Sequence, residues 1–159
     1  MNKLRERGFT LVEIMIVMVI IGILATIAIP NMDFVSSKNR LRSSTSEVTS
    51  SLYLARMKAV NDGVQYGVKF QEDGDFYVVK DPYGTNEIKG ATNHLGDGIT
   101  FSEITFVDWL AVFNEFGQLV KACLPSGDLT GSIRLIDSSV DSTQVDVTFI
   151  SGRIRETNL

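Results

Sequence analysis

The chain has 159 residues and a formal net charge of −4, with one cysteine and one histidine. This length favours a single globular domain beside any terminal helix, and the acidic charge argues against a generic nucleic-acid binder. With Cys123 alone, an intrachain disulfide is excluded. We find no phosphate-binding glycine loop, no metal-ligand spacing and no nucleophile beside His94, so we expect neither enzymatic activity nor a cofactor or metal.

Residues 9–29 form an apolar segment that contains one acid, Glu13. As a helix these residues extend about 31 Å, enough to cross a bilayer. The basic residues before the segment predict a cytoplasmic N-terminus, with the bulk of the chain outside; they are Lys3, Arg5 and Arg7. A carboxylate in this setting costs free energy, which indicates a functional role and a cationic partner for Glu13.

The run Gly8-Phe9-Thr10-Leu11-Val12-Glu13, placed between a basic leader and an apolar helix, resembles the prepilin signature of type IV pilins and type II secretion pseudopilins. The resemblance implies that a prepilin peptidase cleaves between Gly8 and Phe9 and methylates the new amine of Phe9. It also implies that Glu13 pairs with the N-terminal amine of a neighbouring subunit. The alternative is a plain signal anchor whose Glu13 lies among lipid headgroups.

After the apolar segment, Pro30 predicts a kink, with Gly22 weakening the helix upstream. From Asn31 to Asp62 the pattern indicates an amphipathic helix that Gly63 ends in a left-handed cap. Its predicted buried stripe consists of Leu41, Thr45, Val48, Leu52, Ala55 and Ala59. The charged residues on its other faces are interpreted as solvated.

Beyond Gly63 the period changes to two, and we predict a mainly antiparallel sheet. The pattern predicts a hairpin formed by residues 64–70 and 75–80, followed by a long loop from Asp81 to Gly98. Further strands are predicted at 99–107, 111–113, 118–123, 131–136 and 144–150. Trp109 is interpreted as a core or turn-packing aromatic. The expected fold is α+β: a leader at 1–8, a long helix at 9–62 (9–29 transmembrane, 30–62 amphipathic), and an extracytoplasmic β domain at 63–159 packed against the helix.

The segment from Val147 to Arg155 resembles the C-terminal end of FimT/GspH-type minor pilins, in which a final strand runs into a Gly-Arg-x-Arg motif. In a strand, Arg153 and Arg155 share one face about 7 Å apart, a spacing that roughly matches successive phosphates. The resemblance implies DNA contact for uptake as one role. The alternative is that these arginines pair with acids of a neighbouring loop or subunit, which the adjacent Glu156 and the acidic charge favour.

These observations predict a minor type IV pilin, a structural subunit that primes or caps pilus assembly. The alternative is the H-type minor pseudopilin of the type II secretion system. The resemblance implies other pilin or pseudopilin subunits, the prepilin peptidase and an inner-membrane assembly platform as partners. It also implies a single-pass location in the bacterial inner membrane, followed by incorporation into a pilus or pseudopilus.

Overall fold

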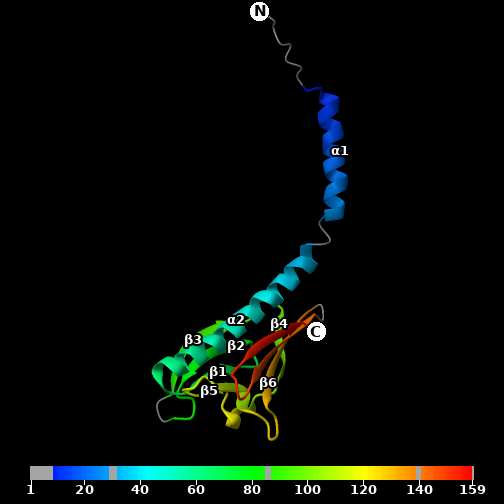
Figure 1. The fold of residues 1–159 in the computed structure, drawn as a ribbon. Helices are drawn as coiled ribbons and strands as arrows, with labels where there is room; N and C mark the ends of the chain where they lie inside the picture. Colours follow the sequence, from blue (N-terminus) through cyan, green and yellow to red (C-terminus); the bar gives the residue numbers. More distant parts are fainter. Residues whose placement is uncertain (1–8, 29–31, 85–86, 139–140, 159) are drawn as a thin grey trace, which may run out of the picture. The chain divides into compact units, whose positions relative to one another are not determined.

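The computed structural model describes residues 9–28, 32–84, 87–138 and 141–158 (Figure 1). Two of the predicted sites, Gly8 and Pro30, therefore lie outside the described residues. The chain divides into two compact units, residues 1–36 and 37–159. Because their relative placement is not determined, each unit is considered by itself.

Helix α1 spans Leu11–Ala28, and from Leu11 to Ala25 it is apolar around its whole circumference apart from Glu13. In the part of the chain that the structure describes, no helix is both long and apolar enough to cross a membrane. The membrane span predicted for residues 9–29 is thus not confirmed and stays a prediction.

Helix α2 spans Met32–Asp62, and Gly63 follows it in the left-handed conformation with φ of 66°. The Gly63 amide hydrogen-bonds to the Ala59 carbonyl at 3.1 Å, so the helix ends as the sequence predicts. The predicted stripe from Leu41 to Ala59 is buried in full. Thr45 is accommodated there because its hydroxyl donates to the Leu41 carbonyl at 2.8 Å.

Two four-stranded antiparallel sheets complete the domain, and α2 lies across them (Figure 1). The first has the order β3-β2-β1-β5, and the second the order β4-β6-β7-β8. The strands of the first sheet are β1 (Tyr66–Phe70), β2 (Asp75–Lys80), β3 (Ile88–His94) and β5 (Leu110–Phe113). Those of the second are β4 (Ile99–Ile104), β6 (Thr130–Asp137), β7 (Ser142–Thr148) and β8 (Ile154–Asn158). The predicted α+β class, a helix packed on antiparallel sheet, is confirmed.

The core lies between α2 and the inner faces of both sheets. Phe70 of β1 and Phe76 of β2 stack with ring centroids 6.3 Å apart, and Phe101 of β4 meets the Phe70 ring edge-on at 5.4 Å. These rings join the two sheets. Burying such a side chain stabilises the fold by roughly 1.5–3 kcal/mol, so a chain without disulfides is held by this apolar contact.

Two predictions for the middle of the β domain are wrong, one of a loop and one of a strand. The segment predicted as a loop, Asp81 to Gly98, contains β3, which lies at the edge of the first sheet and pairs with β2. Every residue of β3 is exposed, so the strand has no buried side whose period the sequence could reveal. The predicted strand 118–123 is instead one bridge, between Phe113 and Leu119, followed by a 3-10 turn over Lys121–Cys123.

The predicted final strand is also corrected. Strand β7 ends at Thr148, residues 149–152 turn, and β8 begins at Ile154. The turn closes with the Gly152 amide donating to the Thr148 carbonyl at 2.9 Å. The segment resembling the minor-pilin C-terminus is therefore the tip of a β7–β8 hairpin, with Arg153 just before β8 and Arg155 within it.

Candidate functional site

The N-terminal segment begins α1 with its own capping chemistry. The Glu13 amide hydrogen-bonds to the Thr10 side-chain oxygen at 3.2 Å and to the Thr10 carbonyl at 3.1 Å. Thr10 thus occupies the N-cap, and Glu13 is the third residue of the helix, the spacing of a capping box. The Glu13 carboxylate also lies at the helix end that favours negative charge. This local role explains an acid at position 13 and does not by itself require a partner.

The exposed apolar surface of the rest of α1 does require a partner, either lipid or other helices. Every side chain from Phe9 to Ala25 is exposed in this single chain, and Phe9 is 81% exposed. A helix that is apolar all round is stable only when surrounded by apolar groups, from lipid or from other helices. Glu13 is the one ionisable group that such a surrounding would have to accommodate in α1. Gly22 lies inside α1, where a β-carbon would meet nothing within 4 Å.

The C-terminal arginines lie on the outer face of the second sheet. Arg153 and Arg155 are exposed, and Ile154 between them is buried. This alternation places both guanidiniums on one face, as the sequence predicts. Arg155 lies opposite Asp146 of β7 in the strand register. Within the residues that the structure describes, neither guanidinium forms an ion pair.

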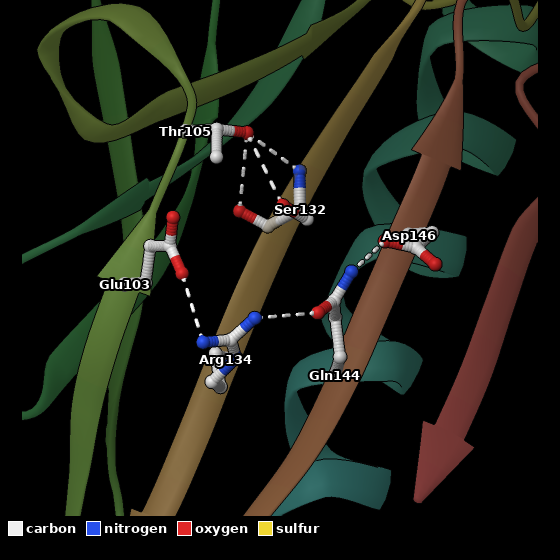
Figure 2. A network of polar contacts seen from close by, with 6 residues as sticks. All are labelled: Glu103, Thr105, Ser132, Arg134, Gln144 and Asp146. Atoms are coloured by element: carbon white, nitrogen blue, oxygen red, sulfur yellow. Dashed lines mark hydrogen bonds and ion pairs between the residues drawn. The ribbon is translucent and has the colours of Figure 1, made fainter. Parts of the chain in front are cut away.

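A polar chain crosses the same face from β4 to β7 (Figure 2). Glu103 pairs with Arg134 at 3.1 Å, Arg134 donates to the Gln144 side chain at 3.2 Å, and Gln144 donates to Asp146 at 2.7 Å. One acid of this chain, Asp146, therefore lies opposite Arg155 and compensates part of its charge. Such compensation weakens the attraction of the face for phosphates.

Sequence analysis missed the role of Arg56, which it treated as a solvated residue of the amphipathic helix. Arg56 Nε donates to the Gly117 carbonyl at 2.9 Å, and a terminal nitrogen donates to the Ser151 carbonyl at 3.0 Å. One side chain of α2 thus holds two turns that are far apart in the sequence. No sequence pattern indicates these partners, because both are main-chain carbonyls of turns that are distant in the sequence.

Comparison with known proteins identifies the family of the chain. Residues 3–29 match the family model described as the prokaryotic N-terminal methylation motif. The type IV major fimbrial protein FimA of Dichelobacter nodosus is 33% identical over 137 residues, covering 82% of this chain and 83% of that protein. The chain belongs to the type IV pilin family. This pilin is also 36% identical over 68 residues to the type II secretion system protein H of Pseudomonas aeruginosa, a match covering 43% of this chain and only 40% of that protein.

Solved structures share the fold of this pilin. The minor pseudopilin EpsH from the type 2 secretion system of Vibrio cholerae matches with a TM-score of 0.58 and 12% identity, over 75% of this chain and 97% of that one. The type IV minor pilin FimU of Pseudomonas aeruginosa matches with a TM-score of 0.61 and 15% identity, over 76% and 90% respectively. The fold is therefore that of minor pilins and pseudopilins.

Proposed function

We propose that this pilin is a minor filament subunit that primes or caps assembly of a type IV pilus. It is cleaved between Gly8 and Phe9, methylated on the Phe9 amine, and drawn from the inner membrane into the filament by a platform in that membrane. Its partners are the prepilin peptidase and other pilin subunits. The observation that carries the proposal is Glu13, the one acid in a helix whose exposed surface is otherwise apolar.

Glu13 acts by fixing the axial position of the helix among its neighbours. In an apolar filament core the carboxylate is stable only beside a cation, which the free amine of a processed neighbouring subunit supplies. A helix displaced along the axis leaves both charges buried and unpaired, and removing one partner of a buried ion pair costs about 3–5 kcal/mol. The correct axial register is thus favoured over registers in which the helix is displaced along its axis.

The first experiment is the intact mass of the protein from membranes of its native host, with and without the prepilin peptidase. We expect a species that begins at Phe9 and carries one added methyl group, and the full-length chain when the peptidase is absent. An uncut, unmethylated chain in cells that have the peptidase would replace the proposal with a plain signal anchor.

The role of Glu13 is tested with Glu13→Gln, which keeps the size and removes the charge. We expect normal processing but loss of the protein from sheared filaments. Glu47→Gln removes an exposed carboxylate from α2 and should leave incorporation unchanged. Equal recovery of both variants in filaments would contradict the pairing.

The second candidate within this architecture is the H-type minor pseudopilin of type II secretion, favoured by the 97% coverage of the EpsH fold. Deletion of the gene in its host distinguishes the two. Loss of surface pili with normal exoprotein secretion supports the pilus assignment, whereas retained pili with exoproteins trapped in the periplasm support the pseudopilin.

DNA contact through Arg153 and Arg155 is a further candidate, supported by the exposure of both guanidiniums on one face. It predicts DNA binding that falls steeply with salt and is lost in the double variant Arg153→Gln, Arg155→Gln. Lys38→Gln, Arg42→Gln is the control, because it removes the same charge from exposed positions of α2. Equal loss in both double variants would indicate only a general charge effect.

A further inference from the structure

An open groove of about 810 Å³ lies beside β1, on a part of the domain that contains none of the candidate sites described above. Lys69 is central to it: its neighbours Val68 and Phe70 are buried in the core, so the Lys69 side chain lies on the opposite face of the sheet. The side chains that give the groove its chemistry are Lys69, Glu72, Asp73, Tyr83, Asp108 and Trp109.

The groove carries more negative than positive charge. Glu72, Asp73 and Asp108 are exposed carboxylates, against the single ammonium of Lys69. That ammonium donates to the main-chain carbonyl of Asp108. The lining side chains therefore have a net charge of −2, which attracts a cationic ligand and disfavours an anionic one.

Two aromatic side chains, Tyr83 and Trp109, line the same groove, and Trp109 also packs against the core. Tyr83 is 53% exposed, and Trp109 is half-buried. Cationic groups bind most favourably over tryptophan and tyrosine rings. A planar guanidinium can stack on such a ring while its edge donates two hydrogen bonds to a carboxylate, which an ammonium cannot do.

The backbone that carries Trp109 is held in an unusual conformation. Asp108 and Trp109 have φ of 54° and 53°, in the left-handed region that a bulky residue rarely adopts. The contacts that hold this conformation are the Lys69 bond to Asp108 and the Trp109 amide bond to the Phe106 carbonyl at 3.2 Å. Residues in this region are strained and keep the conformation only where the surrounding structure holds them in it. The strained turn places an indole and a carboxylate side by side in the groove.

We propose that this groove binds an arginine-bearing extended segment of a protein partner. The guanidinium stacks against Trp109 or Tyr83 and is neutralised by the carboxylates, while the open shape admits the chain on either side. A neutral sugar would stack on the rings and donate its hydroxyls to the carboxylates, but its binding would not draw on the net charge and would not weaken with salt. The proposal concerns the extracytoplasmic domain and does not depend on the filament role of Glu13.

Trp109 is the single tryptophan of the chain, so intrinsic fluorescence reports on the groove directly. The experiment titrates the full chain in detergent micelles with an acetylated Gly-Arg-Gly-Arg-Gly amide. Its control is the same peptide with neutral citrulline in place of arginine. We expect a saturable change in emission with the arginine peptide, weaker binding at high salt, and no saturation with citrulline. Equal binding of both peptides, or no binding of either, would overturn the proposal.

Variants of the acidic lining residues test whether the arginine peptide binds in the groove. Glu72→Gln with Asp73→Asn should weaken binding of the arginine peptide about fivefold, because two partly screened charge contacts with the peptide are lost. The matched control, Asp97→Asn with Asp128→Asn, removes the same charge from exposed positions outside the groove and should leave the affinity unchanged. Equal weakening by both double variants would show a general charge effect. Binding of maltopentaose that is insensitive to salt would instead assign the groove to sugars, and either result overturns the proposal.

Discussion

Gly152 lies directly against Gly117: a β-carbon placed on Gly152 would be 2.0 Å from the Gly117 carbonyl oxygen. That oxygen also accepts the bond from Arg56, so the turn containing Gly117 cannot retreat without breaking the contact with α2. Gly152 further has φ of 57°. The glycine of the Gly-Arg-x-Arg segment therefore has a packing role, independent of any use made of the two arginines.

Gly152→Ala should lower the free energy of unfolding by about 3 kcal/mol, from the left-handed backbone and the steric clash together. The measurement is denaturant unfolding of the full chain in detergent. Gly63→Ala is the control, since Gly63 has a similar φ of 66° and nothing within 4 Å of a β-carbon. It should cost about 1 kcal/mol. If the two variants lose the same stability, the close approach of the two turns contributes nothing.

Arg56→Met should lower the free energy of unfolding by about 2 kcal/mol, because two main-chain carbonyls lose a charged donor. Arg56→Lys should recover part of this loss, since an ammonium cannot reproduce the two directions of the guanidinium. The same unfolding experiment measures both. Arg42→Met, at an exposed position of the same helix, should stay within about 0.5 kcal/mol of the wild type. A loss at Arg42 as large as that at Arg56 would contradict the assigned role.

The parts of the fold that the sequence predicts are those set by local patterns. The buried stripe of α2, the Gly63 cap and the β1–β2 hairpin each depend on residues close together in the chain. Strand β3 escaped prediction because it is exposed on both sides and paired at one edge. The segment 118–123 was misassigned because its buried residues, Leu119 and Cys123, contact the core without a strand ladder.

Among the candidate sites too, those set by a local pattern are predicted from the sequence, and those set by distant contacts are not. Glu13 and its Thr10 cap belong to one continuous motif, whereas Arg56 acts on turns 61 and 95 residues away. The groove was missed because no sequence pattern specifies the left-handed backbone of Asp108 and Trp109. Trp109 packs against the core, as the sequence predicts, but its place at an acidic groove depends on contacts among distant segments.

The end of α2 should make stability depend on acid pH. The Tyr66 hydroxyl donates to Asp62 Oδ2 at 2.5 Å, and this bond, aided by Lys80, lowers the pKa of Asp62 below its ordinary value of 3.8. The folded state therefore binds its proton less readily than the unfolded state. The stabilisation is present above pH 3.8 and is lost as the pH falls through the lowered pKa.

Tyr66→Phe removes that hydroxyl and keeps the ring. Unfolding curves between pH 2 and 6 should show a smaller decline in stability towards low pH for this variant than for the wild type. Tyr53→Phe serves as the control, because Tyr53 donates at 3.5 Å to the main-chain carbonyl of Ile154, which does not titrate. A decline in Tyr66→Phe as steep as that of the wild type would contradict the coupling to Asp62.

Cys123 should make stability depend on alkaline pH. Its thiol is buried, which raises its pKa, and the sulfur donates to the Val120 carbonyl at 2.8 Å. The unfolded state therefore loses this proton more readily than the folded state. The contribution is complete below the ordinary thiol pKa, and it is lost as the pH rises from there through the raised value.

Two measurements test the burial of the Cys123 thiol and its effect on stability at alkaline pH. Alkylation of Cys123 by iodoacetamide at pH 8 should be slow in the folded chain and become fast only in denaturant, because the thiolate is the reactive form. Cys123→Ala should lose less stability than the wild type between pH 8 and 10.5, whatever its stability at neutral pH, since it has no thiol to ionise. Rapid labelling of the folded protein, together with parallel stability profiles, would mean that the thiol is open to solvent and that its burial has no effect on the pH dependence.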